Sequence, residues 1–568
     1  MAGQDLRWTH GVHNNSLVSQ EITAHHRSAS LVRPSPWTQE RRNRVVIGGV
    51  ACVALCVLLL QALFRSHFSA VDEYDDGVYF GASVELVHRV LAYRSFAFIQ
   101  PPLITVWMLP FAAVSTVIGT AHAMEAARFF VDLVTTANVV LVGALIRHHS
   151  TLQVFVGTAV MAFSQGTIRS SQTILLEPFL VLATLCAFLC LLDGERLTTS
   201  SRRLWWCGIL LGVAGATKVW AVFPFVAVLI VARRAGFGAQ RKIATGAAIG
   251  FTVCCAPFIA GAPSSFFSQV VLTQAIRNGS GYSFLQRLAD LTGIPGLAEL
   301  ATRHIQIGAI VVSVVVASSF ALWLGVQISR EQSRWSPLEL LALWSALITG
   351  VGLLVSPTYY YHYSGFMAPF VALIGSSLVA RYRIPVCTNS LSHSRLLPLV
   401  LAAVALPSAV ALMLGASVDD IVTLPAAPQV GDVVSDAIPP RGCVLYANPT
   451  LALLDDRFTS DVSGCPDVID WLGQERVLDN GQSVARSDAD DRHLQVLISR
   501  WIESSDAVVL EQSNLGLDSA NVTYLTSHFA REINIPRGLR IYVRSRPAGA
   551  RATASPSSRG HRSPTPRR

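Results

Sequence analysis

Charged residues are scarce in this chain of 568 residues: they make up 14% of it, whereas hydrophobic residues make up 51%. The mean hydropathy is +0.45. This composition excludes a water-soluble protein over most of the length, and we interpret the chain as a polytopic membrane protein. No cleavable signal peptide is expected, because residues 1–44 are polar and the first apolar run, 45–64, is long enough to stay as an anchor.

Lysine is almost absent. Lys218 and Lys242 are the only two, so arginine carries nearly all of the net charge of +8. Such a bias is typical of the codon usage of a high-GC bacterium. We attribute the basic surplus to the loops of a membrane protein rather than to nucleic-acid binding, because positive charge collects on the cytoplasmic side of spanning helices.

The cysteines have no metal-binding spacing, and eight of the ten lie in or beside apolar runs. No cofactor is implied, and a divalent cation is not indicated. The other two, Cys443 and Cys465, share the one large soluble region. They either form a disulfide, which a compartment outside the cytoplasm permits, or remain two free buried thiols, because a sequence does not reveal their distance.

Apolar runs predict about eleven transmembrane helices, since roughly 20 apolar residues cross a bilayer. No internal repeat is evident. The predicted spans are 45–64, 126–146, 151–168, 174–192, 204–220, 221–232, 243–261, 305–327, 338–356, 365–380 and 396–415.

The apolar stretch 101–118 decides the topology. If it crossed the membrane, every later arginine-rich loop would lie outside, against the positive-inside rule. We therefore expect it to be broken by Pro110 and to lie at the interface or re-enter. The N-terminus is then on the cytoplasmic side of the plasma membrane. The segments expected outside are 65–125, 169–173, 262–304, 357–364 and everything after 416.

Four regions follow from this division. Residues 1–44 are expected to be a disordered cytoplasmic N-terminus, 45–415 the transmembrane domain, 416–545 an α/β domain outside the cytoplasm, and 546–568 a disordered basic tail. Within the α/β domain, alternating and apolar patterns predict strands at 443–448, 506–512 and 539–544, and an amphipathic helix at 494–504.

Four carboxylates, Asp72, Glu73, Asp75 and Asp76, lie within one stretch of five residues a short way beyond the first apolar run. Apolar residues recur at helical spacing over 77–93, which predicts a helix lying on the membrane surface and holding the acids at its boundary. Transferring a sugar to a hydroxyl needs a general base, and a carboxylate at a dry interface suits that task. Asp75 and Asp76 are the candidates, with Tyr79 beside them; an acidic outer loop without a role is the alternative. Asp72 and Glu73 are expected to be solvated.

Polar residues at the outer ends of other apolar segments complete the candidate site. Glu177 precedes a proline at membrane depth, where an ionisable group marks a site or forms a structural ion pair with Arg169 or Lys218. Lys218 suits a phosphate, or it snorkels to the interface. The remaining candidates are Gln100 before a Pro-Pro turn, Tyr360 and His362 in an aromatic loop that is either a sugar site or an interfacial belt, and, for phosphate, Arg277 and Arg287.

Three short motifs, DDGVY (75–79), YRSF (93–96) and PPL (101–103), resemble the GT-C superfamily of membrane glycosyltransferases. The likeness is greatest to the protein-mannosyltransferase and lipid A aminoarabinose-transferase branch. Arg128, the Glu177–Pro178 pair and Lys218 fall where that family also has an arginine, an acid-proline pair and a lysine. The sequence departs from the family pattern at Asp76, where glutamate is commoner, and at Ser95, where the family has aspartate.

The resemblance implies an inverting glycosyltransferase with a polyprenyl-phosphate sugar donor, with Asp75 as base and with Lys218 and Arg169 on the donor phosphate. It implies a mannosyl or arabinosyl donor. The acceptor is an envelope glycan, a glycolipid, a secreted protein or a peptide. The outer domain with its cysteine pair resembles those of actinobacterial members. Two alternatives remain: a transporter or lipid-linked-sugar flippase, which would place ionisable groups at midplane on several helices, and a non-catalytic envelope scaffold.

Overall fold

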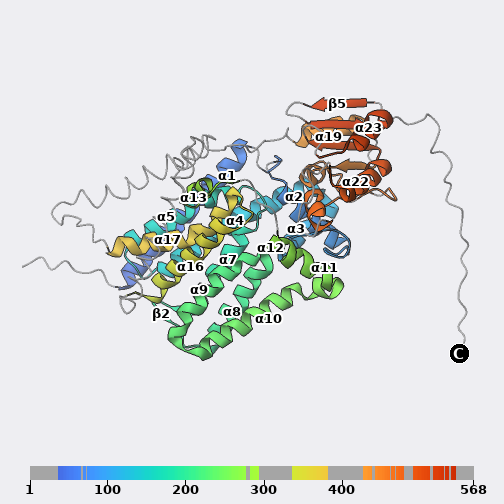
Figure 1. The fold of residues 1–568 in the computed structure, drawn as a ribbon. Coiled ribbons are helices and arrows are strands. Elements are labelled where there is room, and N and C mark those ends of the chain that lie inside the picture. The colour runs from blue at the N-terminus through green and yellow to red at the C-terminus, as the bar shows by residue number, and fades with distance from the viewer. Residues whose placement is uncertain are drawn as a thin grey trace, which may run out of the picture.

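The computed structural model shows a bundle of long helices with a smaller α/β domain at one end (Figure 1). The C-terminal domain, in orange and red, lies beside α2 and α3, although these helices come early in the chain. The structure describes residues 36–65, 68–71, 73–276, 282–292, 335–381, 427–437, 442–460, 462–466, 468–478, 490–511, 516–529, 531–535 and 539–544.

Five helices in the described part of the chain are long and apolar enough to cross a membrane. They are α1 (Pro36–Arg65), α4 (Thr120–Ile146), α10 (Phe237–Gly261), α16 (Pro337–Val355), and η5 (Tyr361–Tyr363) continued by α17 (Ser364–Arg381). The predicted multi-pass helical fold is confirmed. Each predicted span within the described ranges contains a helix, whereas 305–327 and 396–415 lie outside those ranges.

Shorter elements connect these helices. They are α5 (Thr151–Phe163), α6 (Gln165–Ser171), α7 (Glu177–Leu191), the β1–β2 hairpin (Leu192–Asp193 and Arg196–Leu197), α8 (Ser201–Thr217), η1 (Val219–Ala221), α9 (Val222–Ala232), η2 (Arg233–Ala235), α11 (Pro263–Phe267), the π-helical η3 (Ser268–Leu272), α12 (Thr273–Ile276) and α13 (Phe284–Thr292).

Helix α8 packs closely against α10 because glycines line both sides of the contact. A Cβ added at Gly212 would lie 2.2 Å from the carbonyl oxygen of Ala247, and one added at Gly250 would lie 2.3 Å from that of Ile209. Small residues spaced four apart let two backbones approach in this way. The contact holds the end of α8, where Lys218 is the C-cap residue.

The first helix begins earlier than expected. Residues 36–44 were predicted to belong to a disordered terminus, but α1 starts at Pro36. Asn43 explains part of this order, because its side-chain amide donates to the carbonyls of Arg147 and His149 at 2.7 and 2.8 Å. These bonds tie the start of α1 to the end of α4, a long-range contact that local composition does not reveal.

The helix that carries the acids is α2 (Asp75–Val87), and it ends six residues before the predicted boundary at Tyr93. Arg89 takes a left-handed conformation with φ of 65°, which ends a right-handed helix. The helix was predicted to lie on the membrane surface, and the structure shows that protein covers most of it. All residues from Asp76 to Glu85 are buried, because α3 packs on α2 from one side and the C-terminal domain covers it from another.

Helix α3 (Leu103–Ile118) runs through Pro110 without a break, contrary to the prediction. A proline inside a helix removes one backbone hydrogen bond, and here the helix continues past that loss. The segments at both ends of α3 lie against the C-terminal domain. Ile99 shares a cavity with Asp470 of that domain, and a Cβ added at Gly119 would lie 2.6 Å from Asp456 Oδ1.

The C-terminal domain contains a four-stranded sheet in the order β3-β4-β6-β5. Its strands are β3 (Val444–Tyr446), β4 (Ala507–Glu511), β5 (Arg531–Ile535) and β6 (Leu539–Val543), and its helices are α19 (Ala427–Ala437), α20 (Pro449–Leu454), α21 (Trp471–Leu478), α22 (Arg492–Ser504) and α23 (Ser519–His528). Strands β3 and β4 are parallel and the other pairs antiparallel. The three predicted strands and the helix at 494–504 are present; β5 was not predicted.

The two faces of this sheet pack against different partners, as the two-residue period of a strand allows. Leu445 and Val508 pack with Ile498 of α22 in the core of the domain itself. Val444 and Val509, one residue earlier or later on the same strands, belong to the cluster that includes α2, α3 and α4. One face of the sheet therefore belongs to the core of the C-terminal domain, and the other face belongs to the core shared with the helical bundle.

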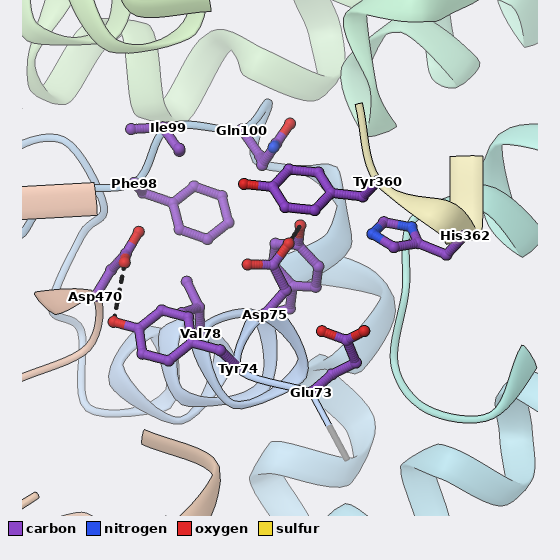
Figure 2. Close-up of a pocket in the computed structure, with 11 residues that line it drawn as sticks. Glu73, Tyr74, Asp75, Val78, Phe98, Ile99, Gln100, Tyr360, His362 and Asp470 are labelled. Atoms are coloured by element: carbon purple, nitrogen blue, oxygen red, sulfur yellow. Dashed lines mark hydrogen bonds between the residues drawn. The ribbon is translucent and has the colours of Figure 1, made fainter. Parts of the chain in front are cut away.

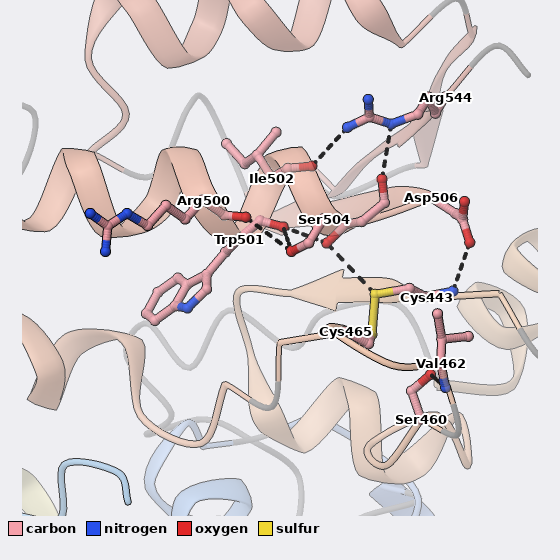
Figure 3. The surroundings of a disulfide bond; sticks show 11 residues. Cys443, Ser460, Val462, Cys465, Arg500, Trp501, Ile502, Ser504, Asp506 and Arg544 are labelled. Carbon is pink, nitrogen blue, oxygen red and sulfur yellow. Dashed lines mark hydrogen bonds between the residues drawn. A yellow bond between two sulfur atoms is a disulfide. The ribbon is translucent and has the colours of Figure 1, made fainter.

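A disulfide joins Cys443, directly before β3, to Cys465, with Cα atoms 5.5 Å apart (Figure 3). The bond closes a segment that contains all of α20. Loop closure of this length stabilises a fold by about 3 kcal/mol in the chain-entropy model. Beside it, Asp506 Oδ2 accepts from the Cys443 backbone N–H at 3.0 Å, so the start of β3 is fixed twice.

We predict that α3 does not cross the membrane, because both of its ends meet the same C-terminal domain. His122 and His148, at opposite ends of α4, are both exposed. In intact cells, a membrane-impermeant maleimide should label His122→Cys and should leave His148→Cys unlabelled. Permeabilised cells should show label at both positions. Labelling at 148 in intact cells would mean that α3 spans and that the topology is inverted from that point.

Candidate active site

A cavity of about 130 Å³ opens where four distant segments of the chain meet (Figure 2). The segments are the start of α2, the turn before α3, the loop between α16 and α17, and the residue before α21. The lining residues are Glu73, Tyr74, Asp75, Val78, Tyr79, Phe98, Ile99, Gln100, Tyr360, His362 and Asp470. Five of the predicted site residues thus lie around one space: Asp75, Tyr79, Gln100, Tyr360 and His362.

Asp75 is the first residue of α2 and lines the cavity. The Tyr79 hydroxyl, one helical turn later, donates to Asp75 Oδ2 at 3.2 Å. Burial raises the pKa of Tyr79 well above its usual range, so this hydroxyl stays protonated as a donor. The helix N-terminus also stabilises a nearby carboxylate. Asp75 is therefore oriented by its own helix while facing open space.

Asp76 is fully buried and faces away from the cavity, since successive helical residues point about 100° apart. Arg128 donates to its Oδ2 from Nη2 at 2.5 Å and from Nε at 3.1 Å. The Thr173 hydroxyl donates to the same oxygen, and the Thr450 hydroxyl lies 2.6 Å from Oδ1. With both oxygens engaged, Asp76 is placed to hold segments together rather than to accept a proton.

Glu73 was expected to be solvated, and this expectation was wrong. It lines the cavity, and its Oε1 accepts a hydrogen bond from the Tyr361 hydroxyl. Burial raises the pKa of Glu73 to about 7. The error arose because Tyr361, 288 residues away, covers the side chain. Asp72, its neighbour, lies outside the described residues.

Glu177, Lys218 and His362 form a buried polar group next to the cavity. Lys218 Nζ donates to Glu177 Oε1 at 2.5 Å, and His362 Nδ1 lies 3.1 Å from Oε2. The lysine also lies over two aromatic rings, 3.9 Å from the ring centre of Tyr363 and 4.3 Å from that of Trp220. Of this group only His362 lines the cavity. The structure therefore contains the Glu177–Lys218 ion pair that was one of the two alternatives.

The predicted phosphate-binding arginines have protein partners of their own. Arg169 Nη1 pairs with Asp290 Oδ1 at 3.1 Å, and its guanidinium lies 5.6 Å from the ring centre of Tyr361. Arg287 donates to carbonyls at the C-terminal end of α16, including those of Leu353 and Leu354 at 3.4 and 3.3 Å. Arg287 thus caps the C-terminal end of α16, where a positive charge is stabilising. Arg277 lies outside the described residues.

Hydrogen bonds to neighbouring residues fix the backbone around Gln100 in the lining of the cavity. The Tyr93 hydroxyl donates to the Gln100 carbonyl at 2.5 Å, so the YRSF turn folds back onto the Pro-Pro turn. Tyr93 takes a φ of 68°, which lets its chain reverse. From the other side, Gln269 Oε1 of η3 accepts from the Phe98 backbone N–H at 2.8 Å. The side chain of Gln100 is therefore presented from a rigid turn.

Asp470 is a cavity residue that sequence reasoning missed. It precedes α21, where its Oδ1 accepts from the Gly473 backbone N–H at 2.6 Å and from the Tyr74 hydroxyl at 3.1 Å. Figure 2 shows this second bond across from Tyr360 and His362. An aspartate before a helix reads locally as an N-cap, and nothing near it in the sequence points to a residue 396 positions earlier.

The cavity is acidic overall. Glu73, Asp75 and Asp470 line it, against the single imidazole of His362. Carboxylates around a cavity can accept hydrogen bonds from hydroxyl groups and repel anions. Next to the cavity, Glu177 contacts both His362 and its ion-pair partner Lys218. Within the described ranges, no three His, Cys, Asp or Glu side chains come together in a way that could hold a metal ion.

Comparison with known proteins identifies the fold. The family model for dolichyl-phosphate-mannose-protein mannosyltransferase matches residues 90–236. The solved structure of ArnT from Cupriavidus metallidurans bound to undecaprenyl phosphate is similar, with a TM-score of 0.55 and 14% identity, over 87% of this chain and 97% of that one. Its apo state gives a TM-score of 0.51 and 15% identity, over 86% and 97%. No curated protein matches the sequence. The resemblance read from the motifs is confirmed: this chain has the fold of the GT-C membrane glycosyltransferases.

Proposed function

We propose that this protein is a membrane glycosyltransferase that moves a sugar from a polyprenyl-phosphate donor to an acceptor hydroxyl on the outer side of the membrane. The observation that carries the proposal is the contrast between the two adjacent acids. Asp75 faces the cavity, oriented by Tyr79, whereas Asp76 is neutralised by Arg128. The family match covers Gln100, Glu177 and Lys218 but begins after Asp75, so the role of Asp75 rests on its geometry.

In the proposed reaction, Asp75 accepts the proton of the acceptor hydroxyl while the oxygen attacks the anomeric carbon. The bond from that carbon to the phosphate oxygen breaks, and the polyprenyl phosphate leaves with the electron pair. Attack opposite the leaving group inverts the anomeric configuration. Gln100, Tyr360 and Asp470 supply hydrogen-bonding groups around the same space, which suits a polyhydroxylated substrate.

Lys218 and His362 are proposed to serve the donor. Three carboxylates around the cavity oppose a phosphate inside it, so we place the phosphate at its His362 edge, toward the buried ammonium. A cation in a dry site attracts the donor phosphate more strongly than it would in water. The similar ArnT structure bound to undecaprenyl phosphate supports a polyprenyl donor, and the match to a mannosyltransferase model favours mannose over arabinose.

The first test of this function is Asp75→Asn, which should lower kcat by about 10²–10⁴, the usual loss when a general base is removed. The measurement is transfer by purified protein from a synthetic short-chain polyprenyl-phosphate mannose, with thermal unfolding to show that the variant folds. Tyr79→Phe is a matched variant and should have a smaller effect, because it removes one orienting bond and leaves the carboxylate. Wild-type transfer by Asp75→Asn, or equal transfer from a nucleotide sugar, would overturn the proposal.

The raised pKa of Glu73 predicts a pH dependence of stability. Its folded-state pKa is about 7, against an ordinary value of 4.5, so the folded protein binds this proton more tightly than the unfolded chain does. This contribution to stability is complete below about pH 4.5 and is lost as the pH rises through about 7. Glu73→Gln should remove that loss and unfold at a higher temperature than wild type at about pH 8. Exposed Glu503→Gln is the control; parallel pH curves for Glu73→Gln and wild type would contradict the prediction.

The role of Lys218 is tested by comparing a single variant with a double variant. Lys218→Met alone leaves Glu177 buried without its partner, which costs about 3–5 kcal/mol of stability. The double variant Lys218→Met/Glu177→Gln removes both charges and should restore folding. If Lys218 binds the donor phosphate, the double variant has a raised donor KM with kcat less affected, which marks lost ground-state binding. A folded double variant with the wild-type donor KM would make Lys218 purely structural.

A further inference from the structure

One short segment of the C-terminal domain packs directly against the start of α2. It extends from Thr450 to Phe458 and lies inside the disulfide-closed part of the domain. Three glycines of the helical bundle receive it. A Cβ added at Gly77 would lie 2.2 Å from Thr450 N, and one at Gly81 would lie 2.6 Å from the Phe458 ring. A Cβ added at Gly119 would likewise meet the Asp456 side chain. Because these three positions have no side chain, the segment can approach the backbone of the helical bundle closely.

Thr450 is the residue of this segment that reaches the acids. Its hydroxyl oxygen lies 2.6 Å from Asp76 Oδ1 and 2.9 Å from the carbonyl oxygen of Glu73. The side chain is fully buried, and its backbone N–H donates to Asn448 Oδ1 at 2.9 Å. The single hydroxyl proton is shared between these two acceptors in a three-centre hydrogen bond, so the hydroxyl links residues on both sides of Asp75 and restrains the backbone from which that carboxylate projects.

A second, separate contact holds the domain on the bundle. The Thr120 hydroxyl donates to the Leu453 carbonyl at 2.5 Å, and the Ala121 backbone N–H donates to Asp456 Oδ1 at 2.9 Å. Asp456 therefore caps the first turn of α4. Because this anchor does not involve Thr450, removing the Thr450 hydroxyl should leave the domain in place.

We propose that Thr450 is a positioning residue of the active site, through which the outer domain holds Asp75 and Glu73 in the geometry for transfer. The catalytic part of this statement rests on the proposed glycosyltransferase function; the mechanical part does not. On this view the C-terminal domain completes the active site, and the Cys443–Cys465 disulfide keeps the Thr450 segment in shape.

The kinetic test compares Thr450→Val with Thr450→Ser in the full-length protein. Valine keeps the shape and removes the hydroxyl, whereas serine retains it. Thr450→Val should lower kcat by about 10- to 100-fold, as expected for a base displaced by a fraction of an ångström. The donor KM should stay within about twofold, and Thr450→Ser should recover most of the rate. Exposed Thr523→Val, on α23, is the matched control. Equal rates for the valine variant and wild type, or no recovery with serine, would overturn the proposal.

Hydrogen exchange tests the mechanical part without any substrate. The backbone amides of Val78 to Phe80 should exchange roughly fivefold faster in Thr450→Val than in wild type, the effect of losing about one hydrogen bond, and should be unchanged in Thr523→Val. Unchanged exchange at these amides would refute the positioning role. Faster exchange in a protein that transfers no sugar from any polyprenyl-phosphate donor would refute the proposed function and leave the mechanical role standing.

Discussion

The buried ion pair between Asp76 and Arg128 is the interaction on which the rest of the site depends. Arg128 lies on α4 and also donates to the carbonyls of Phe68 and Ala70 at 2.8 and 2.9 Å, in the segment after α1. Asp76 receives further hydroxyls from Thr173 and Thr450. Losing either charge would leave the other buried and uncompensated, at a cost of about 3–5 kcal/mol. One pair therefore ties α2 and α4 to three other segments of the chain.

A second pair, Glu177 with Lys218, joins the start of α7 to the end of α8. Both pairs are buried, and each carboxylate in them has a cation within 2.5 Å. The carboxylates that line the cavity, Asp75 and Asp470 among them, are instead oriented by tyrosine hydroxyls. A phenol orients a carboxylate through a hydrogen bond and brings no positive charge of its own. The two buried pairs thus differ from the cavity acids in the kind of partner that holds each carboxylate.

Much of the fold was predictable because it depends on short-range patterns. Apolar runs located the helices, and alternation located β3, β4 and β6. The errors have two causes, one local and one long-range. The helix of the acids ends at Val87 because Arg89 takes a left-handed turn, and it is buried because a domain more than 350 residues later in the chain covers it. Glu73 is shielded by Tyr361 rather than solvated. The burial of α2 and of Glu73 comes from contacts between residues far apart in the chain, whereas the end of α2 depends on the local conformation of Arg89.

The sequence by itself determined which residues could react: an acid pair at the start of a helix, a lysine at the end of another, and two cysteines in one soluble domain. Chemistry at that level is set by residue type and local spacing. Only the tertiary structure decided that Asp75 faces the cavity while its neighbour Asp76 faces Arg128, because that choice depends on where α4 packs. It alone brought Asp470 and Thr450 to α2, since the partners of a buried polar group are set by packing between segments that have no local sequence relation.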